Sequence, residues 1–120
     1  MTPDATLSAA ENPLGVDGFE FVEFTGPDPQ AMIARLELMG FVQTHVHPAT
    51  GVVRMKQGDI SFLVHTKPQG HAAEFATNHG PSANGMAFRV ADAKAAYEAA
   101  VARGATPADV SEGGALGQGA

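Results

Sequence analysis

The stretch FEFVEFTGPDPQAMIARLELMG, residues 19–40, decides the fold, because the chain repeats its pattern 64 positions later. The stretch predicts a β-strand followed by a helix that Asp28 caps and Gly40 ends. The same shift aligns the positions that fix structure: Val22 with Met86, Phe24 with Phe88, Met32 with Ala96, Ile33 with Tyr97, Leu36 with Ala100, Asp28 with Asp92, and Gly40 with Gly104. We interpret this agreement as an internal repeat of one strand–helix unit.

Composition limits the chain to one acidic domain. Its 120 residues are 44% hydrophobic and 17% charged, which suits a single packed core. A net charge of −6 argues against a nucleic-acid-binding surface, since neutralising phosphates requires clustered Lys and Arg. The sequence has no cysteine, no apolar run of the ~20 residues that a membrane span needs, and no secretory signal pattern at its start. These features predict a soluble, cytoplasmic protein.

The first part of the chain predicts one complete module. Residues 1–17 are mostly small and polar, and we expect a flexible N-terminal arm there. The first module, residues 18–66, is expected to hold a strand, a helix and three strands, over 18–25, 28–40, 41–47, 52–57 and 60–66. Gly58 and Asp59 separate the last two apolar runs, a pair typical of a tight hairpin.

A second module begins but is not completed. A linker helix is expected over 70–80, and residues 84–104 repeat the first strand and helix, so the domain spans 18–104. Residues 105–120 form a tail of Gly, Ala and other small residues, whereas three further strands would need large apolar side chains. The sheet edge and apolar faces left open predict a truncated piece of a larger fold, or pairing with another copy.

Three segments resemble a known family: NPLGVDGFEFVEF (12–24), MKQGDISFLVHTKP (55–68) and FATNHGPSANGMAFRVADA (75–93). Together with the repeated module they resemble the vicinal oxygen chelate superfamily, and within it the N-terminal domain of bacterial 4-hydroxyphenylpyruvate dioxygenase. The resemblance implies an α+β fold of the vicinal oxygen chelate type, with one βαβββ module followed by an incomplete second module.

The resemblance also implies a reaction, which belongs to a part of the family's chain that is absent here. Family members use Fe(II) and O2 to convert 4-hydroxyphenylpyruvate to homogentisate in tyrosine catabolism, and related enzymes form 4-hydroxymandelate. Two histidines and one glutamate of the C-terminal domain hold the iron, a set suited to oxygen activation. The chain is therefore expected to be an inactive N-terminal domain, truncated before the iron-binding domain, with self-association or that missing domain as its partner.

The positions that hold metal in other relatives of the superfamily lack ligands in this chain. The position is Phe21 in the first strand of the first module and Gly85 in the first strand of the second. The 64-residue shift pairs these two positions independently of the resemblance. The last strand of the first module offers at best His65, and one imidazole is too few for a transition-metal site. We therefore predict no catalytic, cofactor-binding or metal-binding residue in this chain.

The remaining histidines have structural interpretations that we prefer. His45 and His47 would place two imidazoles on one strand face, but the strand ends at Pro48 and no third ligand is near in sequence. His65 and His71 are expected at the surface. His79 precedes Gly80 and suits a helix C-terminus, where imidazolium meets the negative end of the helix dipole.

Glu23 is the one candidate for a buried carboxylate. It could serve as a base, but we prefer a pairing with Arg89 of the repeated strand. Two other functions stay open beside the domain assignment. One is a stand-alone dimeric protein of the bleomycin-resistance type that binds a small aromatic ligand, with Phe19, Phe21 and Phe62 lining its cleft. The other is a glyoxalase-type metal-dependent lyase or isomerase, which the residues at positions 21 and 85 disfavour.

Overall fold

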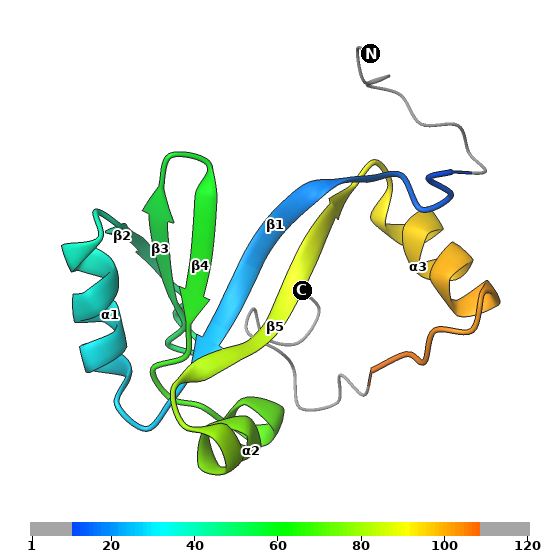
Figure 1. Cartoon of the computed structure of the whole chain (residues 1–120). Coiled ribbons are helices and arrows are strands. Elements are labelled where there is room, and N and C mark those ends of the chain that lie inside the picture. Colours follow the sequence, from blue (N-terminus) through cyan, green and yellow to red (C-terminus); the bar gives the residue numbers. More distant parts are fainter. Residues whose placement is uncertain (1–10, 109–120) are drawn as a thin grey trace. The chain divides into compact units, whose positions relative to one another are not determined.

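A computed structural model of the chain describes residues 11–108. Along these residues a strand, a helix and three strands are followed by a helix, a strand and a last helix. Their bounds are β1 Val16–Thr25, α1 Pro29–Leu38, β2 Val42–Val46, β3 Val53–Gln57, β4 Ile60–Val64, α2 Gly70–His79, β5 Ser82–Val90 and α3 Ala93–Ala102 (Figure 1). The described chain is therefore mixed α+β, with the βαβββ order predicted for the first module.

The repeat is present in the structure down to its helix caps. The Oδ1 atoms of Asp28 and Asp92 each accept a hydrogen bond from the backbone N–H three residues later, at 3.1 Å in both cases. Helices α1 and α3 are both ten residues long. Gly40 and Gly104 follow them with φ angles of 99° and 106°, a region that side chains other than glycine rarely adopt. Equivalent residues thus start and stop equivalent helices.

Strand β1 begins at Val16, two residues before the predicted start. The side chain of Asn12 explains this, because its Oδ1 accepts from the N–H of Val16 and its Nδ2 donates to the Val16 carbonyl, both at 3.0 Å. The predicted arm therefore ends too late, at residue 17 rather than 15; residues 1–10 lie outside the described part. Residues 105–108 of the predicted tail carry no regular secondary structure, and 109–120 also lie outside it.

The five strands form one sheet in the order β2-β3-β4-β1-β5. Strands β2, β3 and β4 are antiparallel neighbours, and Gly58 and Asp59 form the turn between β3 and β4, as predicted. Strand β1 pairs with β4 in parallel, with Glu23 opposite Leu63. This parallel pairing places residues at the ends of β1 and β4 beside one another.

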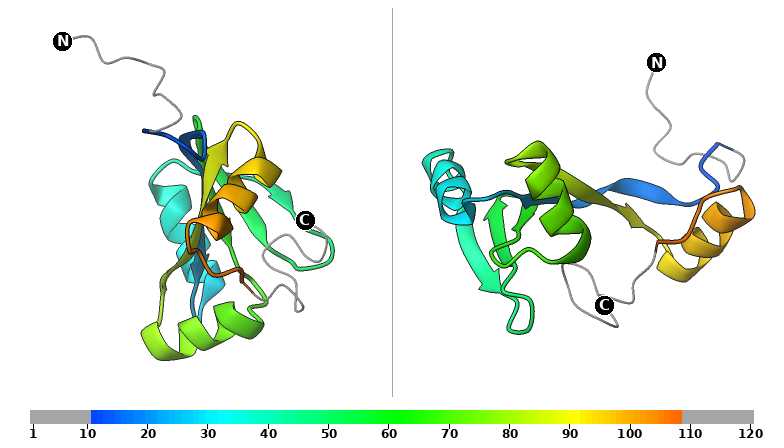
Figure 2. Two further views of the ribbon diagram at one scale, coloured as in Figure 1. Left: turned by 90° about the vertical axis from the view of Figure 1, so that its right-hand side faces the viewer. Right: turned by 90° about the horizontal axis from the view of Figure 1, so that it is seen from below.

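The chain divides into two compact units, and each is described by itself. In the larger one, residues 20–87, α1 packs along one face of β2–β4 (Figures 1 and 2). The buried side chains on this face are Ile33, Leu36, Phe41, Val53, Met55 and Val64. Phe62 also belongs to this side, since its ring stacks on Phe41 at 4.8 Å and meets Phe24 edge-on at 4.9 Å. Phe62 therefore lies in the α1 core, which corrects its predicted place in a ligand cleft.

The opposite face of the same strands carries a smaller apolar cluster. Successive side chains of a strand point to opposite faces, so Val52 and Leu63 lie away from α1, where Phe21 packs against them. Helix α2 lies at the end of β1, where the hydroxyl of Thr25 donates to the carbonyl of Ala72 at 2.9 Å (Figure 2). Within residues 11–108, every helix is too short or too polar to cross a membrane.

Candidate functional site

A hydrogen-bonded pair of ionisable side chains lies at the junction of β1 and β4. Nε2 of His65 lies 2.8 Å from Oε1 of Glu23, and the two side chains are only 10% and 21% exposed, respectively. The parallel pairing of the strands continues past β4, because the N–H of His65 donates to the carbonyl of Phe24 at 2.9 Å. The backbone therefore fixes the imidazole beside the carboxylate.

Gly85 on β5 completes this site by leaving room for the carboxylate. A Cβ atom placed on Gly85 would lie 3.0 Å from Oε2 of Glu23, which is tighter than about nine in ten real Cβ contacts. The φ angle of Gly85 is not positive, so a side chain there would be opposed by the nearby carboxylate rather than by the backbone conformation. Oε1 of Glu23 thus contacts His65, while Oε2 lies where a side chain at position 85 would begin.

The structure corrects one sequence prediction about these residues and adds a contact that was not predicted. His65 is buried rather than at the surface, and Glu23 bonds to it. The reason is the parallel β1–β4 pairing, which brings together residues 42 positions apart. A buried imidazole beside a carboxylate satisfies both groups, since burying either alone would be costly.

The histidines at residues 45 and 47 do not share a regular strand face. The register of β2 shifts between Gln43 and His45, and the strand ends at Val46. Nδ1 of His47 lies 3.2 Å from the backbone nitrogens of Ala49 and Thr50 and accepts from both. His47 therefore holds the turn before β3 in place, which agrees with the structural interpretation.

The remaining histidines belong to α2 and flank one aromatic ring. His71 and His79 lie one turn before and after Phe75, with ring centroids 5.5 Å and 4.4 Å from it. Nε2 of His71 also lies 3.3 Å from the carbonyl of Asn84. His79 occupies the last turn of α2, directly before the C-cap Gly80, as predicted. These contacts secure α2 and leave the two imidazoles well apart along the helix.

The residues present do not fit an iron site. Positions 21 and 85 hold a phenyl ring and a glycine, and the nearby donors His65 and Glu23 bond to each other. Iron of the kind that activates oxygen takes two histidines and a carboxylate on one side of the metal. Within residues 11–108, no group of three or more His, Asp or Glu side chains is arranged to hold a metal ion.

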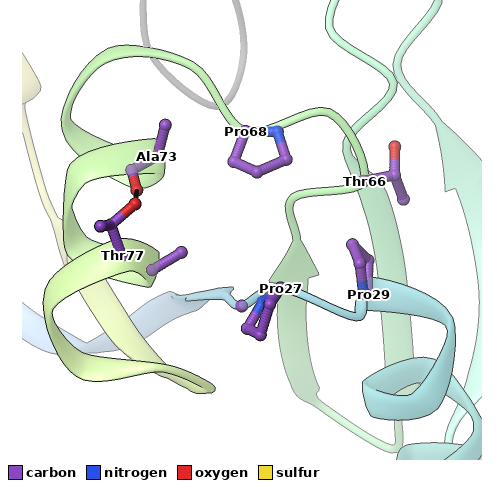
Figure 3. A pocket seen from close by; sticks show the side chains of 8 residues that line it. Pro27, Pro29, Thr66, Pro68, Ala73 and Thr77 are labelled. Atoms are coloured by element: carbon purple, nitrogen blue, oxygen red, sulfur yellow. Dashed lines mark hydrogen bonds between the residues drawn. The ribbon is translucent and has the colours of Figure 1, made fainter.

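A separate pocket of about 330 Å³ lies beside α2 in the larger unit (Figure 3). Its walls come from the β1–α1 loop, the segment after β4 and one side of α2: Gly26, Pro27, Pro29, Thr66, Pro68, Ala73, Ala76 and Thr77. The hydroxyls of Thr66 and Thr77 donate to the carbonyls of Gly51 and Ala73. The lining is therefore uncharged and mostly apolar, and the two threonine hydroxyls in it already donate to backbone carbonyls.

Comparison with known sequences identifies a family model and several relatives that this chain matches. Residues 10–116 match the family model described as hydroxyphenylpyruvate dioxygenase, N-terminal. The chain is 44% identical over 102 residues to Protein MelA of Shewanella colwelliana. It is 41% identical over 103 residues to the 4-hydroxyphenylpyruvate dioxygenase of Pseudomonas sp. (strain P.J. 874). These matches cover 85% and 86% of this chain, which spans 30% and 29% of the two relatives' lengths.

A comparison with solved structures agrees. A variant of 4-hydroxymandelate synthase from Streptomyces coelicolor matches with a TM-score of 0.64 and 25% sequence identity, over 76% of this chain and 31% of the other. The α+β fold of the vicinal oxygen chelate type, expected from the resemblance, is therefore confirmed.

Proposed function

This chain belongs to the family of hydroxyphenylpyruvate dioxygenase N-terminal domains, and from this premise we propose that it is a non-catalytic domain that works with an iron-binding domain outside it. The reaction of the whole protein would be the Fe(II)-dependent conversion of 4-hydroxyphenylpyruvate to homogentisate in the cytoplasm. The chain spans about 30% of the length of the curated relatives it matches, which leaves room for such a domain.

The observation that carries the proposal is the closed Glu23–His65 pair. The two donors nearest to the superfamily's ligand positions are bonded to each other at 2.8 Å, and the space that a ligand at position 85 would occupy is filled by the Glu23 carboxylate. A carboxylate and an imidazole that satisfy each other's hydrogen bonds are suited to structural support. The domain's role would be to cover the iron-binding domain and to contribute to subunit assembly, including self-association.

The test is oxygen consumption by the purified chain. With Fe(II), a reductant and 4-hydroxyphenylpyruvate, the chain alone is expected to consume no oxygen above the buffer rate and to form no homogentisate. The intact Pseudomonas relative serves as the positive control under the same conditions. Turnover by the chain alone that scales with its concentration would contradict the proposal.

A second candidate, a stand-alone binding protein, is favoured by the pocket beside α2. Its volume of about 330 Å³ lies at the lower end of the range of small-molecule sites, and its lining is apolar. A ligand that binds the folded chain raises its melting temperature by mass action. We would test a panel of aromatic acids. A rise in melting temperature with one of them, abolished by Ala76→Trp, would support this function. No rise with any member of the panel would contradict it.

A further inference from the structure

The face of strands β2–β4 that points away from α1 carries two basic side chains. Arg54 and Lys56 alternate along β3 with Val53 and Met55, which are buried in the α1 core, so both basic residues lie on the opposite face. Residues two positions apart on a strand lie roughly 7 Å apart. Strand β3 pairs with β2 on one edge and with β4 on the other, so the backbone holds the two side chains in fixed positions.

The neighbouring strands add two hydrogen-bonding side chains to the same face. Ser61 lies opposite Lys56 on β4, and its hydroxyl oxygen accepts a hydrogen bond from Nη2 of Arg54 at 3.3 Å. His45 lies opposite Arg54 on β2. Residues directly opposite one another on antiparallel strands share a face and are close neighbours on it. We call these four residues, Arg54, Lys56, Ser61 and His45, the β3 basic cluster.

The two cations of the cluster have no counter-charge beside them, although the protein is acidic. The chain has 13 Asp and Glu against seven Lys and Arg. Within residues 11–108, no carboxylate forms an ion pair with Arg54 or Lys56, and Glu23, which shares their face of the sheet, bonds to His65 instead. Both cations are half-buried, and a charge withdrawn from water is unfavourable without a partner. An anion that bound here would supply that partner.

We propose that the β3 basic cluster binds the oxyanion of a small organic molecule, a carboxylate or a phosphate, whose apolar part rests on Val42. The guanidinium of Arg54, which Ser61 orients, takes two oxygens in its planar fork, and Lys56 adds a second positive charge. Val42 lies opposite Lys56 and is 63% exposed, so it offers an apolar surface beside the charge. The cluster is separate from the pocket beside α2, whose lining holds no charged residue.

The experiment titrates the full ¹⁵N-labelled chain with four probes at constant ionic strength and follows the amide signals of β3. Phenylacetate and phenyl phosphate carry the two oxyanions, 2-phenylethanol is their neutral counterpart, and inorganic phosphate lacks the apolar part. We expect saturable shifts at Arg54 and Lys56 with phenylacetate or phenyl phosphate, and the tighter of the two identifies the oxyanion. The neutral alcohol and inorganic phosphate should each bind about tenfold more weakly or not at all.

Arg54→Gln and Lys56→Gln should each raise the Kd of the tighter anion about tenfold or more, because each removes a charge-assisted hydrogen bond. Lys94→Gln is the matched control: it removes one positive charge from an exposed position on α3, in the smaller unit, and should leave the affinity unchanged. Circular dichroism checks that each variant folds.

Four results would overturn the proposal. They are no saturable binding of either aromatic anion, equally tight binding of 2-phenylethanol or inorganic phosphate, a loss of affinity in Lys94→Gln as large as in Lys56→Gln, and shifts that Ala76→Trp abolishes while Arg54→Gln does not. The last result would place the ligand in the pocket beside α2. Oxygen consumption tests the domain role separately, so the two proposals can fail independently.

Discussion

Replacing Gly85 with alanine is expected to destabilise the fold, although the backbone conformation would tolerate the change. At a strand position without positive φ, Gly→Ala normally stabilises by roughly 0.4–1 kcal/mol, because it restricts the unfolded chain. Here the new Cβ would lie 3.0 Å from Oε2 of Glu23, whose other oxygen is held by His65. Moving the carboxylate breaks a hydrogen bond of the charged class, worth about 1.5–3 kcal/mol. The net expectation is a loss of roughly 1–2 kcal/mol in unfolding free energy.

A double-mutant cycle separates this explanation from a general intolerance of side chains at position 85. In a Glu23→Ala background the obstructing carboxylate is gone, so Gly85→Ala should change sign and stabilise the protein. In a Glu23→Gln background the side chain keeps its volume, so Gly85→Ala should remain destabilising. Residues in direct contact give interaction energies of about 0.5–3 kcal/mol in such cycles.

The assay is urea unfolding followed by far-ultraviolet circular dichroism, with the slope of free energy against urea checked for constancy. A loss of similar size in both the wild-type and the Glu23→Ala backgrounds would refute the reasoning, because the carboxylate would then not be the obstacle.

Three further outcomes are expected from the same structure. Met55→Ala should cost about 2–5 kcal/mol of unfolding free energy in urea melts, since Met55 is fully buried in the α1 core. Asp28→Ala should cost about 1 kcal/mol through loss of the α1 cap in thermal melts, while Asp28→Asn should cost much less because asparagine caps nearly as well. Asn12→Ala should speed amide exchange at Val16 without changing exchange at Leu63, because the Asn12 side chain fixes only the start of β1.

The local elements could be predicted from the sequence because their signals are local. Asp28 and Asp92 begin equivalent helices, Gly40 and Gly104 follow them, and the Gly58–Asp59 turn joins β3 to β4. Each of these features depends on the preferences of a few adjacent residues. Because the strand–helix unit is repeated, the same local signals also predict the order of strands and helices in the second module.

The contacts of the site could not be predicted in the same way, because they depend on which strands are neighbours. Nothing in the spacing of Glu23 and His65 indicates that β1 and β4 run in parallel side by side. The same pairing decides that Phe62 points into the α1 core while Leu63 points to the opposite face. The role of Asn12 was not predicted, because an asparagine among small polar residues is common in loops. Only the structure shows that its side chain bonds to the backbone of Val16.

The central claim is that Glu23 and His65 bond to each other and are therefore not available to a metal ion. The most direct measurement is an anaerobic calorimetric titration of the purified chain with Fe(II). We expect no saturable binding, and the same flat response from a His65→Ala variant. A one-to-one binding event in the unmodified chain that disappears in His65→Ala would contradict the claim, because it would show that His65 exchanges Glu23 for iron.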